Sequence, residues 1–371
     1  MTCVMIWALV FSSSGRHTNA KLSESRMMLR VMTGLLRAGC ALWMFGAGSA
    51  LAAQTTSLVP HYTLQASIPL GDPDKWDYVV FDPVDQRVYV AHGTGVTVID
   101  ASRDKVIGTL GGIDGAHGIV PMPKLGKIFA DSGKTGTVIV YDDKTLAPLA
   151  IIPAVGDADG MNYDSASGQV VVMGGDSASV GFINPQTDRL TATLPLGGSP
   201  EGSAMDGAGK MYVNISDRNE IAVVDTKAPR VLAEWKLTGC NDPHGMTIDP
   251  SHTKLFVSCP AGHMAVVSIA RGRQIGLVRI GRGTDTAAFD PVHDIALSSD
   301  GDGTLGIVAD RGAALGGAPT EKGARTMAVD PATGRVFMVT ATVDHEAKPR
   351  ASGAPHFVFV PGSVRLLVYT P

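Results

Sequence analysis

Aromatic residues and cysteines are scarce in this chain, whereas glycine and proline are frequent. Aromatic residues make up 6% of the 371 positions and there are four cysteines, against 44 glycines and 22 prolines. The sequence also lacks the motifs G-x-S-x-G and H-E-x-x-H and the P-loop motif G-x-x-x-x-G-K-[ST], so it carries no signature of the enzymes that use them. Turn residues and short apolar runs without a helical period favour an all-β protein.

Acidic residues are missing from residues 27 to 53. Arg30 and Arg37 precede the apolar stretch AGCALWMFGAGSALA, which ends in an A-x-A site at residues 50–52. This order is typical of a secretory signal peptide. We therefore expect residues 1–52 to be a signal peptide, with residues 1–26 reflecting a start codon placed too early, and the protein to be periplasmic or secreted. An uncleaved anchor is the alternative, but the apolar run is shorter than the ~20 residues of a membrane span.

Residues 54–371 contain fewer basic than acidic residues. Residues 1–53 contain five basic residues and one acidic residue, so their removal changes the formal net charge from −4 to −8. A chain this acidic has no general attraction for nucleic acid or anionic lipid. We expect a monomer without a transmembrane segment after signal cleavage, whose partner is a small polar ligand or an envelope protein.

An internal repeat of about 41 residues runs through residues 76–371. Each unit contains a turn with aspartate, often followed by proline, and then a short apolar run such as RVYVAH or KLFVSC. The unit at Met122–Pro123 lacks the aspartate but aligns with the others. The turn aspartates are Asp82, Asp164, Asp206, Asp249, Asp290 and Asp330. The sequence therefore contains seven repeats.

Four short strands in each unit predict the blade of a β-propeller. We expect residues 53–371 to form one all-β domain, a seven-bladed propeller of four-stranded blades. The last repeat ends at its third strand, and residues 62–71 match the fourth strand of a blade. This N-terminal strand should complete the last blade and close the ring, because an unpaired strand edge is a liability.

A resemblance to a known family rests on the stretch RVYVAHGTGVTVIDASRDKVIGTL, residues 87–110. It is similar to the YVTN repeat of the YncE-like family of secreted bacterial proteins, and the resemblance covers residues 62–371. It implies a seven-bladed propeller in the periplasm or at the cell surface. It implies little about activity, because the family is defined by its scaffold.

Two cysteines and two histidines have the spacing Cys240-x3-His244-x14-Cys259-x3-His263. Three interpretations remain open: a disulfide, two free buried thiols, or a zinc site with all four residues as ligands. We favour a disulfide between Cys240 and Cys259, because they are the only cysteines after residue 53 and export would place them in an oxidising compartment.

One position of the repeat, five residues before the turn aspartate, is ionisable in every unit, and it lies where the innermost strands should begin. We expect these side chains to surround the mouth of the central channel and to bind a small polar or cationic ligand. A merely hydrated channel mouth is the alternative. The seven residues are Asp77, His117, Asp159, Glu201, His244, Asp285 and Arg325.

A divalent metal such as Ca²⁺ or Zn²⁺ is a further expectation for this channel mouth. Only side chains from adjacent blades can share one ion, which favours Glu201, His244 and Asp285 as its ligands. The long loop of residues 341–356 in the last unit should emerge on the same face and either cover the mouth or extend into solvent. Its polar residues are His345, Glu346, Lys348, Arg350 and His356.

Two classes of function fit these features. We favour a binding or scaffold protein that uses the channel mouth, with no chemistry of its own. The alternative is a metal-dependent hydrolase, lactonase or lyase in which His117 or His244 is the general base. The binding interpretation requires no catalytic pair within hydrogen-bond reach, and no sequence motif supplies one.

Overall fold

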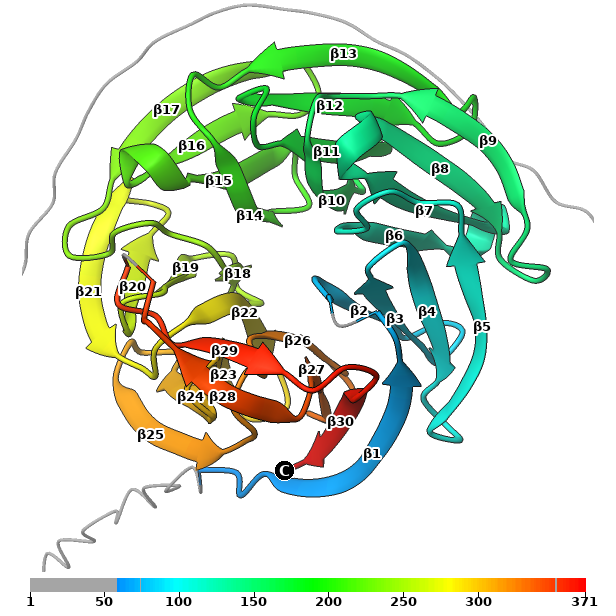
Figure 1. The fold of residues 1–371 in the computed structure, drawn as a ribbon. Coiled ribbons are helices and arrows are strands. Elements are labelled where there is room, and N and C mark those ends of the chain that lie inside the picture. The colour runs from blue at the N-terminus through cyan, green and yellow to red at the C-terminus, as the bar shows by residue number, and fades with distance from the viewer. Residues whose placement is uncertain (1–58, 74, 351) are drawn as a thin grey trace, which may run out of the picture. The chain divides into compact units, whose positions relative to one another are not determined.

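The computed structural model describes residues 59–371 except residues 74 and 351. These residues form seven four-stranded antiparallel sheets arranged as blades around a central axis (Figure 1). The predicted all-β fold with seven blades is confirmed. The predicted signal peptide lies outside the described residues. None of the helices within the described residues has the length and apolar character that crossing a membrane requires.

Blades 1 to 3 each run from the channel outward in chain order. Blade 1 contains β2 (Val79–Asp82), β3 (Arg87–His92), β4 (Gly95–Asp100) and β5 (Lys105–Gly111). Blade 2 contains β6 (Ile119–Met122), β7 (Lys127–Ser132), β8 (Thr137–Asp142) and β9 (Pro148–Pro153). Blade 3 contains β10 (Ala158–Asp164), β11 (Gln169–Gly174), β12 (Ser179–Asn184) and β13 (Arg189–Pro195).

Blades 4 to 6 repeat the same order. Blade 4 contains β14 (Pro200–Met205), β15 (Lys210–Ile215), β16 (Glu220–Asp225) and β17 (Arg230–Lys236). Blade 5 contains β18 (Met246–Ile248), β19 (Lys254–Cys259), β20 (His263–Ser268) and β21 (Arg273–Arg279). Blade 6 contains β22 (Thr284–Asp290), β23 (Ile295–Asp300), β24 (Thr304–Ala309) and β25 (Ala314–Pro319). Three short 3-10 helices lie in the connections: η1 (Pro123–Leu125), η2 (Gly133–Thr135) and η3 (Ser216–Arg218).

Blade 7 combines both ends of the described chain. Its strands are β26 (Thr326–Val329), β27 (Val336–Thr340), β30 (Val364–Thr370) and the N-terminal β1 (Thr63–Gly71). β1 pairs antiparallel with β30, with Thr63 opposite Thr370 and Ser67 opposite Leu367. The predicted closure by the N-terminal strand is confirmed.

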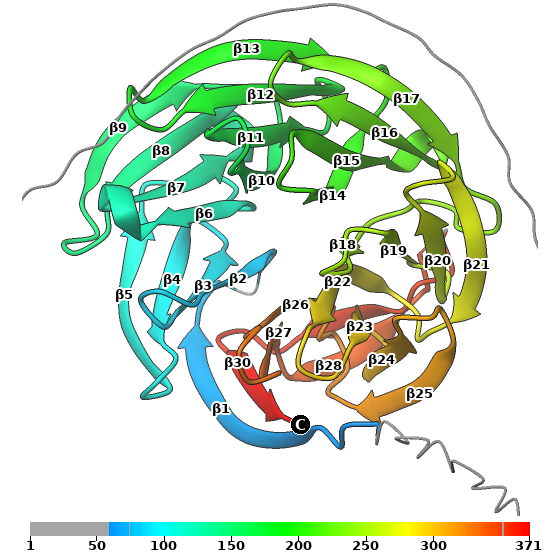
Figure 2. The same cartoon turned by 180° about the vertical axis from the view of Figure 1, so that it is seen from behind.

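A hairpin interrupts blade 7 between β27 and β30. Its strands, β28 (Val343–Ala347) and β29 (His356–Phe359), pair only with each other. The hairpin lies in front of the blades in Figure 1 and behind them in Figure 2, so it projects from one face of the ring. We call this the top face.

The core consists of seven apolar clusters, each between two neighbouring blades. The second and third strands of a blade are buried on both sides, because each sheet packs between two others. Outer strands such as β5 alternate exposed and half-buried residues. This packing explains why the second strands are continuous apolar runs in the sequence.

Charged side chains join neighbouring blades on the face opposite the hairpin. The first residue of a second strand reaches the turn after the third strand of the next blade, as Lys127 Nζ does to Asp188 at 2.8 Å. Lys254 makes the same link to Asp310 at 2.9 Å. Arg335 of blade 7 contacts Asp104 of blade 1 at 3.0 Å. The same type of ion pair thus links several pairs of neighbouring blades, including blades 7 and 1, where the ring closes.

Cys240 and Cys259 form a disulfide with a Cα–Cα distance of 5.4 Å, so the predicted pairing is confirmed. Because the two sulfurs are bonded to each other, they are not available as the thiolate ligands of the zinc alternative. The bond joins the loop before β18 to the end of β19, and both cysteines are fully buried. It therefore fixes the loop that carries His244.

Breaking this disulfide should destabilise the protein. A bond between residues 19 positions apart lowers the entropy of the unfolded chain by an amount worth about 3 kcal/mol. We expect a reducing agent to lower the thermal unfolding temperature of the wild-type protein. The variant Cys240→Ser/Cys259→Ser should unfold at the lower temperature with or without reductant. Equal unfolding temperatures for oxidised wild type and this variant would contradict the assignment.

Candidate functional site

The seven ionisable residues of the repeated position surround the channel mouth on the top face, and all seven are half-buried. In blades 3, 4 and 6 they are the second residue of the innermost strand, which places Asp159, Glu201 and Asp285 in β10, β14 and β22. In the other four blades they lie in the loop that leads into that strand. These loop residues are Asp77, His117, His244 and Arg325.

In blades 2 to 5 a glycine follows the ionisable residue and lets adjacent blades approach closely at this point. A Cβ atom on Gly202 would lie 2.2 Å from the carbonyl oxygen of His244. The backbone N–H of Gly202 donates a hydrogen bond to the carbonyl oxygen of His244 at 3.0 Å. Asn214 of β15 donates to the same oxygen at 2.8 Å. The backbone of the ring residues is therefore held by contacts between blades, which orients their side chains toward the mouth.

His117 lies between two carboxylates from the neighbouring blades. Its Nδ1 is 2.6 Å from Asp77 and 2.9 Å from Asp159. The fully buried Asp131 accepts the backbone N–H groups of His117 at 3.0 Å and Gly118 at 2.9 Å. Asp131 thus fixes the backbone of His117, and the carboxylates of Asp77 and Asp159 both contact its Nδ1 atom.

These contacts determine the protonation of the group. Burial favours neutral imidazole, but hydrogen bonding of the imidazolium to the acceptors Asp159 and Asp77 outweighs it and raises the pKa of His117 to about 11. Burial raises the pKa of Asp131 to about 8, although the charge of His117 opposes this. His117 therefore holds its proton at neutral pH.

His244 uses both ring nitrogens on the opposite side of the mouth. Nδ1 is 2.9 Å from Asp285 and Nε2 is 3.4 Å from Asp242. Arg325 Nε lies 3.2 Å from the other oxygen of Asp285. Burial opposes the imidazolium, but Asp242 and Asp285 raise the pKa of His244 to about 11. Burial also opposes ionisation of Asp285, but Arg325 and His244 lower the pKa of Asp285 to about 2.

Glu201 separates the two groups. Its carboxylate forms no hydrogen bond or ion pair with any of the described residues. Burial raises the pKa of Glu201 to about 8; the nearby charge of His244 lowers it, and those of Asp159, Asp285 and Asp77 raise it. Of the predicted metal ligands Glu201, His244 and Asp285, only the last two contact each other, and Asp285 also pairs with Arg325. A metal at these three residues stays a prediction.

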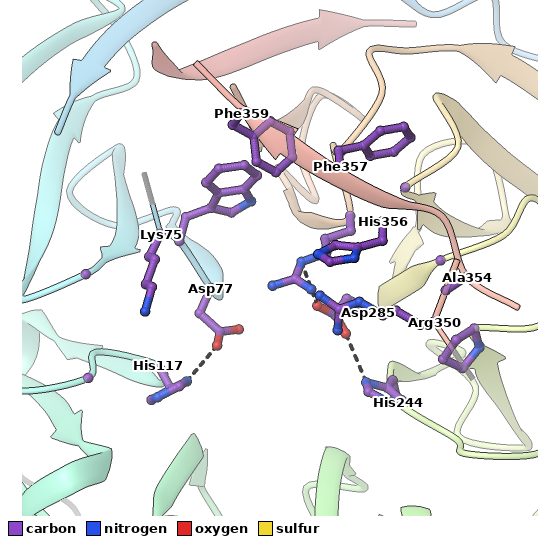
Figure 3. Close-up of a pocket in the computed structure, with 18 of the residues that line it drawn as sticks. Lys75, Asp77, His117, His244, Asp285, Arg350, Ala354, His356, Phe357 and Phe359 are labelled. Carbon is purple, nitrogen blue, oxygen red and sulfur yellow. Dashed lines mark hydrogen bonds and ion pairs between the residues drawn. The ribbon is translucent and has the colours of Figure 1, made fainter. Parts of the chain in front are cut away.

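A cavity of about 860 Å³ opens over the mouth on the top face (Figure 3). Five of the seven predicted residues line it: Asp77, His117, His244, Asp285 and Arg325. Asp159 and Glu201 are not among its lining residues. Below it, Tyr78 lines a smaller space of about 180 Å³ within the channel.

Aromatic side chains form one wall of this cavity. Trp76 and Phe359 meet edge to face with ring centroids 4.9 Å apart, and Phe357 lies beside Phe359 at 6.3 Å. All three line the cavity. Sequence reasoning missed this wall, although Trp76 immediately precedes the ring residue Asp77. The two phenylalanines belong to β29, which has no counterpart in the other repeats.

The predicted long loop covers the cavity with part of its length. Arg350 and His356 line the cavity, whereas His345, Glu346 and Lys348 do not. Glu346 instead lies 3.7 Å from Lys322. The expectation that this loop emerges on the same face as the ring residues is thus met by its second half.

No protein-family model matches this chain, and it matches no curated protein. The chain is a seven-bladed β-propeller. This architecture is consistent with a propeller repeat family, and membership of the YncE-like family stays a prediction. The fold is a common scaffold for binding sites.

Neutralising Glu201 should stabilise the protein at alkaline pH. Because the pKa of Glu201 is about 8 in the folded protein and near 4.5 in the unfolded chain, its ionisation disfavours folding as the pH rises from about 4.5 through 8. We expect Glu201→Gln to raise the unfolding temperature at pH 9 by about 5–10 °C and to change it little at pH 5.

The control for this measurement is Glu234→Gln. Glu234 lies on the outer strand β17, and its side chain is 45% exposed. Its replacement should give the same small difference from wild type at both pH values. A Glu201→Gln effect that does not grow between pH 5 and pH 9 would show that Glu201 is not held in an unfavourable environment.

Proposed function

We propose that this protein is an exported binding protein whose top-face cavity holds a small organic molecule with a negatively charged group. The observation that carries the proposal is the pair of arginines at one side of the cavity. Arg325 engages Asp285 through Nε. Among the described residues, the guanidinium of Arg350 forms no hydrogen bond or ion pair.

Arginines with unused donors suit a carboxylate or phosphate. A guanidinium presents several N–H groups in one plane and binds such anions through two parallel hydrogen bonds. The two η-nitrogens of Arg325 have no acceptor among the described residues. Arg325 belongs to the ring at the channel mouth, whereas Arg350 belongs to the hairpin above it. An anion between the two arginines would therefore contact both the ring and the hairpin.

The aromatic wall indicates a ligand larger than a simple inorganic ion. Trp76 is 8% exposed, and its Nε1–H has no acceptor within the part of the chain that the structure describes. Together with Phe357 and Phe359, its indole ring gives the cavity an apolar surface suited to an organic ligand. The cavity volume of about 860 Å³ also lies within the usual range for small-molecule sites. These features favour an organic ligand over an envelope protein.

The state of His244 favours binding over catalysis. A general base must be able to accept a proton near the working pH. The pKa of His244 is raised to about 11 by its carboxylate neighbours Asp242 and Asp285, so this histidine already holds a proton at neutral pH. A metal-dependent hydrolase, lactonase or lyase stays the alternative.

Export is supported by the disulfide. Structural disulfides persist in oxidising compartments such as the periplasm and are rare in the cytosol. The bond between the fully buried Cys240 and Cys259 therefore agrees with the signal peptide predicted for residues 1–52.

The proposal is tested with a thermal-shift panel of glutarate and glucuronate against their uncharged counterparts glutaramide and glucose. We expect at least one acid to raise the unfolding temperature, with no shift from its uncharged counterpart. Arg350→Gln should weaken the binding of that acid by about tenfold, the loss expected for one charge-assisted hydrogen bond.

Lys348→Gln is the matched control, because Lys348 is an exposed cation of the same hairpin that does not line the cavity. This variant should bind like the wild type. Trp235→Phe leaves Trp76 as the only tryptophan of residues 53–371, so binding should change its fluorescence. No response to any acid, or equal affinities for wild type and Arg350→Gln, would contradict the proposal.

A further inference from the structure

Three side chains from consecutive blades bring metal-ligand atoms together on the other side of the channel mouth. Asp77 of blade 1, His117 of blade 2 and Asp159 of blade 3 each offer one such atom, and these atoms lie within 4.8 Å of one another. Two of the three residues line the cavity. The group is separate from the arginines to which the proposed anion would bind.

His117 Nδ1 faces more carboxylate acceptors than it has hydrogens to donate. His117 Nδ1 lies within 2.9 Å of two carboxylate oxygens from different residues. This nitrogen carries at most one hydrogen, which points along one direction and so makes one good hydrogen bond. One imidazole nitrogen and two carboxylate oxygens around one point are, in contrast, an ordinary ligand set for a divalent transition metal.

The balance of charge around His117 differs from that around His244, and the difference favours binding of a cation at His117. On the opposite side, the carboxylates Asp242 and Asp285 face two cations, His244 and Arg325. Around His117, two carboxylates face a single imidazole. A metal cation in place of the imidazole proton would compensate this excess of negative charge.

The surroundings hold the ligands in place and leave one side open. Asp131 fixes the backbone at His117 by accepting the N–H groups of His117 and Gly118. Because Asp77 and His117 line the cavity, water or a ligand can reach the remaining coordination positions.

We propose that Asp77, His117 and Asp159 bind one divalent transition-metal ion, with Zn²⁺ preferred over Ca²⁺. Zinc accepts imidazole nitrogen and carboxylate oxygen in a four-coordinate site, whereas calcium takes six to eight oxygen ligands. Three protein ligands leave an open position toward the cavity. This site differs from the predicted set of Glu201, His244 and Asp285.

Isothermal titration calorimetry of the purified full chain, freed of metal and carrying no affinity tag, tests this site with ZnCl₂ and CaCl₂ alone. We expect one Zn²⁺ per chain and weaker binding of Ca²⁺. Asp159→Asn and His117→Gln should each weaken Zn²⁺ binding by more than about tenfold. Co²⁺ should give a visible absorption band in the wild type that both variants lose.

Asp242→Asn is the matched control, because Asp242 is the equivalent carboxylate beside His244. It should bind Zn²⁺ like the wild type, and circular dichroism should show that all variants are folded. The proposal is wrong if the wild type binds no Zn²⁺, if Asp159→Asn and His117→Gln bind as tightly as wild type, or if Ca²⁺ binds more tightly. The anion panel above contains no metal, so either proposal can fail alone.

Discussion

Pairing of β1 with β30 closes the ring, and the geometry of the site depends on that closure. The third and fourth strands of blade 7 come from opposite ends of the described chain. Tyr62, just before β1, donates a hydrogen bond to the turn aspartate Asp290 of blade 6 at 3.0 Å. An open ring would allow blades 7 and 1 to separate, which would move Arg325 away from Asp77 and widen the channel mouth.

Closure turns a repeated sequence position into a ring of charges, but the ring is not symmetric. Repetition fixes where the backbone of each residue lies, and the residue type then determines what each side chain contacts. On one side a histidine and an arginine balance two carboxylates. On the other, one histidine faces two carboxylates. This asymmetry gives the cavity one side suited to an anion and another suited to a cation.

The repeat period predicts the blade number, the closure and the ring positions, because each depends on backbone spacing. Contacts within the ring are less accessible to sequence reasoning. Blade order suggests Glu201 and Asp285 as partners of His244, whereas the structure pairs His244 with Asp285 and with Asp242, two residues earlier in its own loop. Which neighbour a side chain reaches depends on its rotamer and on packing, and a column of residue types does not encode either.

The aromatic wall shows a second limit. Phe357 and Phe359 come from an insertion with no equivalent in the other units, so no internal comparison reveals where they lie. Trp76 occupies a position next to the ring but is not repeated. Features that recur seven times are predictable from one sequence, whereas features that occur once, and which here distinguish this cavity, required the structure.

Hydrogen exchange followed by mass spectrometry tests ring closure most directly, by comparing β1 with the outer strands of other blades. β5, β9 and β13 hold the equivalent outer position and should set the reference rate. If β1 completes blade 7, its amides should exchange as slowly as those of the three reference strands. Exchange of β1 at the rate of an unprotected chain, while the reference strands and β30 stay protected, would contradict the closed ring and the site built on it.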